Sequence, residues 1–403
     1  MNPDPATLSS RNRTLFLSAV LHAFTHIYQI ALMPLYLLIR DDLALESIEE
    51  ATLLVTVMMV SYFLPSYPMG RLADRANRKN LLALGLLVDG LGFVLLGLSK
   101  TFAWALVSVV IAGVGGSCFH PAATALIAGL YPERPGRALG WLGVGASVGF
   151  FFGPLYAGWR AHDGGWRAPV IELGVLGVVM AAVFWKWASE GGRTSGSAPA
   201  VREKLFKRGT VLVAFLCMAL GFSLRDFAGA GNATLSSLYL QKAYGDSVEL
   251  AGRALSFVFL ASAFSNPIFG HWSDKNRLGW AAGLLLVAAG CQACLPHLSH
   301  GAFPYGLMAF GFFLMATYPV VEAALMQAVP ASIRASFFGL FITIGGLLGN
   351  GSHWAIGKLV AGLGTAAGDP KAYTAMFSIL AACLALSIVA LPCLRLIDRA
   401  NRV

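Results

Sequence analysis

Charge is scarce in this sequence. Of its 403 residues, 57% are hydrophobic and only 12% are charged, whereas a soluble globular domain carries roughly 25% charged residues. Too few charges remain to coat a water-facing surface, so much of the protein surface must face lipid. The excess of basic over acidic residues, 29 against 20, does not indicate nucleic acid. The Lys and Arg residues occupy short segments between apolar runs, as in membrane proteins.

Motifs for nucleotide-driven and metal-dependent chemistry are missing. The sequence contains no Gly-x4-Gly-Lys-Ser/Thr loop and no His-Glu-x2-His pair. We therefore expect no enzyme activity, no cofactor, no metal site and no ATP-driven pumping. Residues 1–13 lack the small-residue processing site of a cleavable signal, so the first apolar run should remain as the first spanning helix.

Cysteine is also rare, with six in the chain. All six lie within or beside apolar runs, where a thiol behaves as a small hydrophobe. Cys291 and Cys294 have the spacing of a redox or metal pair. The segment 283–298 around them is typical of a membrane helix, so we interpret the pair as packing residues.

Long apolar runs are abundant. A span needs about 20 apolar residues, and such runs occur near 14–39, 47–70, 80–99, 102–130, 138–160, 167–188, 210–240, 252–271, 279–297, 303–328, 336–360 and 372–394. Residues 189–208 are rich in Gly, Ser, Pro and charge, which predicts a flexible cytoplasmic linker. We predict an all-α integral membrane protein with twelve transmembrane helices, in six-helix bundles at 1–188 and 209–403.

Basic residues cluster in alternate loops: before the first run, after the second, in the central linker and at the C-terminus. The other loops carry mostly acidic residues or isolated bases. We expect the protein to lie in the inner (plasma) membrane of the cell. The positive-inside bias then places both termini and the linker in the cytoplasm.

The two halves repeat each other with a shift of about 200 residues. Gly70 and Asp74 end the second run, and Gly270 and Asp274 end the eighth. The same shift relates Pro121 to Pro319, Pro132 to Pro330, and Arg137 to Arg334. Duplicated six-helix halves with a substrate site near the midplane are a transporter architecture.

Residues 70–79, Gly-Arg-Leu-Ala-Asp-Arg-Ala-Asn-Arg-Lys, resemble the loop signature of the major facilitator superfamily. Asn77 stands where that pattern has its second glycine, and Asn tolerates left-handed backbone better than other non-glycine residues. The resemblance implies a gating role for Gly70, Asp74, Arg75 and Arg78, and for Gly270 and Asp274 in the repeat. Arg75, Arg78 and Lys79 could also bind acidic lipid headgroups, and topology anchoring alone is the alternative.

Two further resemblances concern transport direction. Gly149-Phe-Phe-Phe-Gly153-Pro154 is similar to a pattern of proton-coupled exporters in this superfamily, in which small residues allow close helix contact and proline can kink the helix. A tight helix contact without a role in direction is the alternative. The early histidines of the first run, together with Ser117-Cys-Phe-His120-Pro121, resemble the fosmidomycin-resistance branch, whose members export small toxic compounds. Ala122 departs from the acidic residue expected there.

Ionisable residues at membrane depth are costly and usually face a cavity or one another. The candidates are His22, His26, Asp89, His120, Glu172, Arg225, Asp226, His271 and Glu322. The resemblance implies that helices 1, 4, 7 and 10 line the central cavity. We expect substrate contact from His22, His26, Tyr28, His120, Arg225, Asn232 and Tyr318.

Arg225 is suited to gripping a carboxylate or phosphonate in bidentate fashion. A buried pair with Asp226 or Glu322 is the alternative, with Asp226 the poorer partner because helical neighbours point about 100 degrees apart. Asp226 and Glu322 are the carboxylates that could carry a proton.

These patterns predict an alternating-access secondary transporter that exports a small organic, perhaps anionic, compound in exchange for protons. An anion importer or exchanger, and a membrane sensor without transport, remain the alternatives. The expected partners are substrate, proton and lipid, with no nucleic acid, and the resemblance implies a monomer.

Overall fold

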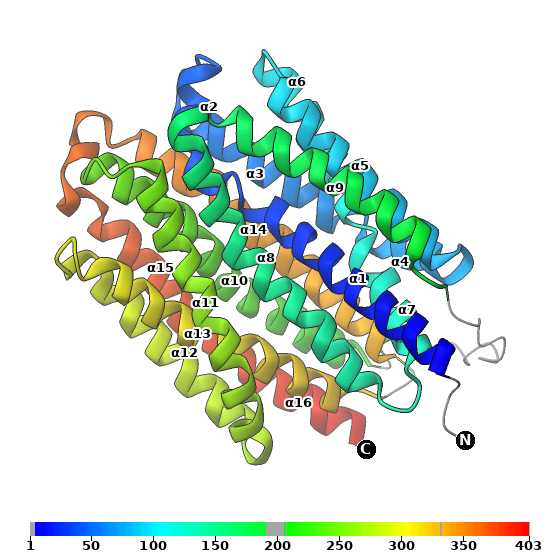
Figure 1. The fold of residues 1–403 in the computed structure, drawn as a ribbon. Coiled ribbons are helices and arrows are strands. Elements are labelled where there is room, and N and C mark those ends of the chain that lie inside the picture. The colour runs from blue at the N-terminus through cyan, green and yellow to red at the C-terminus, as the bar shows by residue number, and fades with distance from the viewer. Residues whose placement is uncertain (1–4, 191–204, 207, 331–332, 403) are drawn as a thin grey trace. The chain divides into compact units, whose positions relative to one another are not determined.

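The fold consists entirely of helices in the part of the chain that the structure describes. A computed structural model covers residues 5–190, 205–206, 208–330 and 333–402. Most of the predicted linker at 189–208 falls outside these ranges. The N-terminal helices are α1 (Pro5–Ile30), η1 (Met33–Leu35), α2 (Tyr36–Asp42), α3 (Ile48–Phe63), α4 (Ser66–Arg75), α5 (Arg78–Leu98), α6 (Phe102–Gly116), α7 (Phe119–Leu130), α8 (Pro135–Gly164) and α9 (Arg167–Trp187) (Figure 1).

The C-terminal half has the same all-helical character. Its elements are α10 (Gly209–Ala243), α11 (Val248–Trp272), η2 (Ser273–Lys275), α12 (Arg277–Cys294), η3 (Leu295–His297), α13 (Phe303–Ala328), α14 (Arg334–Ala361), η4 (Gly364–Gly368), η5 (Pro370–Tyr373), α15 (Thr374–Leu386), η6 (Ser387–Val389) and α16 (Ala390–Arg402).

Twelve helical segments follow the predicted apolar runs. Eleven of them are long and apolar enough to cross a membrane within the described residues. The twelfth is α14, a 28-residue helix that carries Asn350, Ser352 and His353 among its glycines. The chain is therefore a multi-pass membrane protein with twelve transmembrane segments in two pseudo-symmetric sets of six, as predicted.

Some spans are broken by short interruptions. Pro34 lies in η1 and Pro65 directly precedes α4. The helices are interrupted there because proline lacks an N–H donor and clashes with the preceding helical turn. A third break separates α6 from α7 at Ser117 and Cys118. Pro121 follows in the first turn of α7, where a missing N–H costs little. This break sets the position of His120.

Helix pairing repeats between the halves. α1 packs along α8, and its counterpart α10 packs along α14; α5 packs on α9, and α12 packs on α15. The repeat extends to helix capping. The side chain of Asn77 accepts from the amide of Asn80 at the start of α5, and Asn276 accepts from the amide of Gly279 at the start of α12. The two caps lie about 200 residues apart, the shift seen in the sequence.

Contacts divide the chain into two compact units. One comprises 1–46 and 57–197, and the other comprises 47–56 and 198–403. The short segment of the second unit lies in α3, where the Thr56 hydroxyl donates to the carbonyl of Asn350 at 3.0 Å and accepts from the amide of Trp354 at 3.0 Å. Each unit has its own cluster of ionisable side chains, and the two clusters are described separately below.

Candidate functional site

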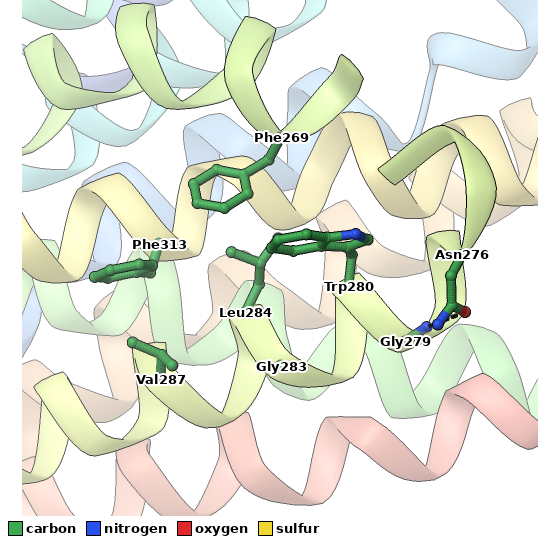
Figure 2. A pocket seen from close by; sticks show the side chains of 8 residues that line it. All are labelled: Phe269, Asn276, Gly279, Trp280, Gly283, Leu284, Val287 and Phe313. Atoms are coloured by element: carbon green, nitrogen blue, oxygen red, sulfur yellow. Dashed lines mark hydrogen bonds between the residues drawn. The ribbon is translucent and has the colours of Figure 1, made fainter. Parts of the chain in front are cut away.

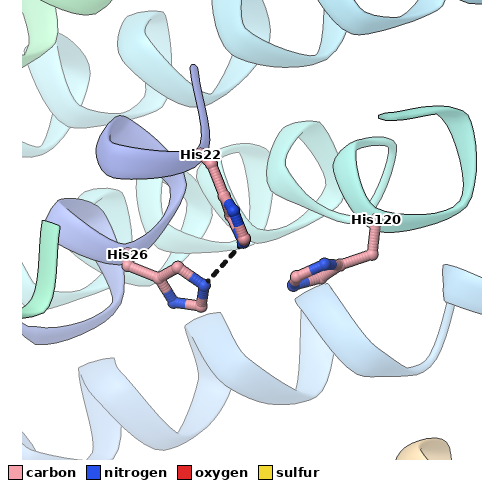
Figure 3. A group of neighbouring side chains, drawn as sticks. All are labelled: His22, His26 and His120. Atoms are coloured by element: carbon pink, nitrogen blue, oxygen red, sulfur yellow. Dashed lines mark hydrogen bonds between the residues drawn. The ribbon is translucent and has the colours of Figure 1, made fainter. Parts of the chain in front are cut away.

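A cluster of three histidines lies in the N-terminal unit. His22 and His26 are four residues apart and share one face of α1, and His120 comes from the first turn of α7. The ligand atoms of the three rings all lie within 4.8 Å of one another. Figure 3 shows the His120 ring pointing toward the other two. The structure thus brings together three of the predicted substrate residues.

Hydrogen bonds fix the two histidines of α1. Nδ1 of His22 lies 2.9 Å from the Leu142 carbonyl of α8, and Nδ1 of His26 lies 2.9 Å from Oε1 of Gln29. The Nε2 atoms of the two rings face each other at 3.1 Å. Both side chains are buried. Sequence reasoning missed Gln29 as a partner, although its i+3 spacing from His26 was visible.

Aromatic rings surround the cluster. The ring of His22 stacks on Phe119 with centroids 4.7 Å apart, and the ring of His26 lies 4.1 Å from that of Phe150. Tyr28 is not part of this group. Its hydroxyl donates to the Leu173 carbonyl of α9 at 2.9 Å, and its ring packs on Phe93 of α5. Tyr28 therefore joins helices within the unit instead of pointing toward the histidines.

Asp89 of α5 is the buried carboxylate of the same unit, with 4% of its surface exposed. It lines a cavity of about 10 Å³ together with Thr25 of α1 and Gly116 of α6. That volume is close to the smallest that holds a water molecule. Asp89 is thus packed inside the bundle.

A charged cluster in the C-terminal unit centres on Arg225. Its side chain is 2% exposed, and Nη2 lies 2.9 Å from Oδ1 of Asp226, with Nε 3.0 Å from the same oxygen. The guanidinium also lies over the ring of Tyr318, 3.9 Å from its centroid. The expectation that Asp226 is the poorer partner is wrong. The long Arg side chain folds along the helix surface and spans the angle between neighbours.

Two polar groups of this cluster lack a partner among the described residues. Nη1 of Arg225 is buried without a hydrogen bond. Glu322 of α13 forms no hydrogen bond or salt bridge in the described part of the chain, yet it lies close enough to Arg225 and Asp226 to act on both electrostatically. A buried spare donor and a half-buried spare acceptor therefore lie in one cluster of the described residues.

Asn232 lies outside this cluster. Its Nδ2 donates to Oε1 of Gln292 on α12 at 2.5 Å, and its Oδ1 accepts from Ser236 at 2.8 Å. A second buried polar group joins α10 to α14, where Nδ1 of His353 lies 2.7 Å from the Thr234 hydroxyl. Sequence reasoning missed Gln292 and His353, because a single polar residue in an apolar run shows no partner until the helices are placed.

Residues 70–79, which resemble the loop signature, form hydrogen bonds with residues elsewhere in the chain. Glu190 accepts from the backbone amides of Arg78 and Lys79 at 2.9 and 2.7 Å, at the start of α5. The guanidinium of Arg78 donates to the Ala125 carbonyl of α7 at 3.3 Å. Asn77 has φ −69° and ψ 114°, so it does not use the left-handed backbone that Asn tolerates. Asn77 acts as a helix N-cap, a position that favours Asn.

The other predicted gating residues of this segment lie in α4. A Cβ atom at Gly70 would meet Pro121 of α7 at an ordinary 3.6 Å. Arg75 is exposed at the end of α4. The side chain of Asp74 lies outside the part of the chain that the structure describes.

The repeated segment in the second half shows a local ion pair. Arg277 Nη2 lies 2.6 Å from Oδ1 of Asp274, one helical turn away. Arg277 also donates to Gln327 of α13 at 3.2 Å. Gly270 has open space where a Cβ would stand. Asp274 therefore has an arginine partner.

Gly149 and Gly153 lie on the face of α8 that contacts α1. A Cβ at Gly149 would overlap the Ala23 carbonyl, and one at Gly153 would lie 3.1 Å from Ile30. α8 continues through Pro154 from Pro135 to Gly164. The pattern resembling exporters is thus a tight helix contact in this unit.

The remaining membrane-edge candidates are partly exposed. Glu172 accepts from Arg160 at 2.9 Å and from the Tyr156 hydroxyl at 2.5 Å, and His271 is exposed at the end of α11. A groove of about 390 Å³ lies among α11, α12 and α13 beside Phe269, Trp280 and Phe313 (Figure 2). It contains none of the predicted substrate residues.

Comparison with known proteins places the chain in a family. The model of the Major Facilitator Superfamily matches residues 15–350. The Fosmidomycin resistance protein of Escherichia coli strain K12 is 25% identical over 334 residues, covering 81% of this chain and 82% of that protein. The Cis,cis-muconate transport protein of Acinetobacter baylyi is 24% identical over 370 residues, covering 84% and 89%.

Other similarities agree. The Quinolone resistance protein NorA of Staphylococcus aureus strain MRSA252 is 24% identical over 263 residues, covering 62% of this chain and 65% of that protein. A solved structure of a bacterial homolog of the human lysosomal transporter Spinster, inward-facing and occupied, superposes with a TM-score of 0.80, covering 97% of each chain at 20% identity. That likeness concerns the fold alone. The predicted resemblance is confirmed: the chain belongs to the Major Facilitator Superfamily and is a secondary transporter, not an enzyme.

Proposed function

We propose that this transporter exports a small organic compound across the inner membrane by alternating access, in exchange for protons, with Glu322 holding the proton and the cargo in turn. The observation that carries the proposal is the Glu322 carboxylate, which has no hydrogen bond or salt bridge among the described residues and lies beside the Arg225–Asp226 ion pair. An ionised carboxylate at membrane depth without a partner is costly. A proton, or a donor group of the cargo, would each remove that cost.

The same group thus gives exchange a physical basis. Proton and cargo compete for Glu322, so a proton bound from outside releases cargo there, and cargo bound from inside releases the proton into the cytoplasm. Arg225 remains neutralised by Asp226 throughout. Two relatives carry names that record resistance to toxic compounds, which supports the export direction. Both termini would lie in the cytoplasm, and one chain would suffice for transport.

A second candidate rests on Nη1 of Arg225, a buried donor without a partner among the described residues. A carboxylate or phosphonate of an anionic cargo would satisfy it. The sign of coupling then reverses, because a proton on Glu322 removes a negative charge and favours anion binding. Proton and anion would travel together, as in uptake. One relative is named for transport of an organic dianion, cis,cis-muconate.

Proteoliposomes with a pH-sensitive dye inside test the proposal. Small phosphonates, carboxylates and organic cations are added under an imposed pH gradient, and cargo and proton movements are recorded together. Exchange predicts opposite movements, which Glu322→Gln abolishes because glutamine cannot take up the proton and removes the carboxylate that holds the cargo. Glu172→Gln is the matched control, since Glu172 is already paired with Arg160, and it should leave proton movement intact.

The other outcomes are equally clear. Proton and cargo movement in the same direction would overturn export by exchange and support anion uptake. Cargo movement without proton movement would remove Glu322 from the coupling. Binding without any flux would identify a sensor.

A further inference from the structure

We propose that His22, His26 and His120 form a binding site for one divalent transition-metal ion of the zinc class, with its fourth coordination position open. The three imidazoles come from two helices, α1 and α7, and their ligand atoms lie within 4.8 Å of one another (Figure 3). Imidazole nitrogen suits zinc, copper, cobalt and nickel. The proposal is independent of the export mechanism, and it departs from the sequence-based expectation of no metal site.

The protonation of the rings follows from their outer hydrogen bonds. The Leu142 carbonyl can only accept, so Nδ1 of His22 must carry a proton to make its 2.9 Å contact. Oε1 of Gln29 also accepts, so Nδ1 of His26 carries a proton as well. In the neutral rings, Nε2 is then the atom with the free lone pair in both histidines.

Those two lone pairs face each other at 3.1 Å. Two acceptors at this distance repel unless an electrophile lies between them, either a shared proton or a metal ion. Zinc–nitrogen bonds of about 2.0–2.1 Å would reach both atoms with an angle of roughly 100° at the metal, near the tetrahedral value. The geometry of the pair therefore matches two ligands of a tetrahedral site.

The surroundings favour a metal over a shared proton. Metal-binding histidines usually donate their other N–H to a carbonyl or carboxylate, which fixes the ring and its tautomer, and both rings of α1 do so. Phe119 and Phe150 pack against the rings. An imidazolium there would be a buried cation with no carboxylate partner among the described residues, whereas a metal ion gains a third nitrogen from His120.

Three protein nitrogens leave one tetrahedral position free. Closed structural zinc sites use four protein ligands, whereas sites with three keep the fourth for water or another ligand. His120 is half-buried, less enclosed than the other two. A water molecule or an oxygen donor of a small molecule would complete the coordination.

The test is metal binding by the full-length protein, purified without a polyhistidine tag. Co²⁺ serves as the probe because tetrahedral nitrogen coordination gives visible absorption, and Zn²⁺ displacement gives the affinity. Wild type should bind one Co²⁺ per chain. His22→Asn, His26→Asn and His120→Asn should each weaken binding more than about 100-fold, beyond the 10–100-fold typical of outer-sphere changes.

Two further variants keep the result interpretable. His353→Asn alters a buried histidine of α14 whose partners are Thr234 and Asn350, and its Co²⁺ binding should match wild type. Gln29→Leu removes the hydrogen-bond partner of His26 without removing a metal ligand, and it should weaken Co²⁺ binding by about 10–100-fold. This variant tests the site even where a histidine variant does not fold. Absence of binding in wild type would overturn the proposal, as would binding that persists undiminished in the histidine or Gln29 variants.

Discussion

Arg225 and Asp226 are neighbours in the chain and form a buried ion pair, with Nη2 of Arg225 2.9 Å from Oδ1 of Asp226. The guanidinium is 2% exposed, whereas the carboxylate is 19% exposed. The arginine therefore depends on Asp226 for neutralisation, and Tyr318 covers its other side. This relationship makes Asp226 a structural support for the cluster.

Asp226→Ala should destabilise the protein strongly. Removing one partner of a buried pair leaves an uncompensated charge and costs about 3–5 kcal/mol. The midpoint of thermal unfolding in detergent should fall accordingly. The double variant Arg225→Met/Asp226→Ala removes both charges and should recover most of the loss. A single variant as stable as wild type would show that Glu322 can replace Asp226 as partner.

Gly149→Ala should destabilise the contact of α8 with α1. The added methyl group would overlap the Ala23 carbonyl, and overpacking of this kind costs about 1–3 kcal/mol. Gly143→Ala on the same helix is the control, because its methyl group would meet open space. Thermal unfolding of the two variants compares them directly. Equal stability would mean that the helices separate without cost.

Asn77→Gly should be nearly neutral, while Asn77→Ala should cost about 1 kcal/mol. Asn77 caps α5 through its side chain and has extended backbone, and N-cap positions tolerate glycine far better than alanine. Unfolding midpoints of both variants provide the measurement. The reverse order of stability would contradict the capping role.

Glu190→Gln should loosen the start of α5 by about 1 kcal/mol, because a carboxylate at a helix N-terminus gains from both the amides and the helix dipole. The rate of hydrogen exchange should rise at the backbone amides of Arg78 and Lys79, which donate hydrogen bonds to Glu190. Glu46→Gln changes an exposed carboxylate elsewhere and should leave this exchange unaltered. Unchanged exchange in Glu190→Gln would show that water replaces the carboxylate fully.

Much of the fold could be predicted from residue patterns. Runs of about 20 apolar residues have few alternatives to a spanning helix, because lipid offers no hydrogen-bond partners to the backbone. The repeat relating Asp74 to Asp274 could also be predicted from the sequence, because each aspartate follows a glycine, Gly70 or Gly270, at the same spacing. The breaks at Pro34 and Pro65 follow from proline itself.

The sites were only partly predictable. His22 and His26 share a face by helical periodicity, but only the packing of α7 brings His120 to them. Tyr28 and Asn232 looked like cavity residues because they are polar in apolar runs. The structure instead gives each a partner on another helix, Leu173 and Gln292. The residue type shows that a buried polar group needs a partner, but it does not show which residue that partner is.

The sequence alone determined the membrane environment, the number of spans, the duplication and the family, because these depend on composition and local periodicity. The tertiary structure decided which polar groups satisfy one another. It paired Arg225 with Asp226, gave Glu322 no hydrogen bond or salt bridge among the described residues, and turned two imidazole nitrogens toward each other. Such pairings depend on side-chain direction and on helices distant in the chain, which no local pattern encodes.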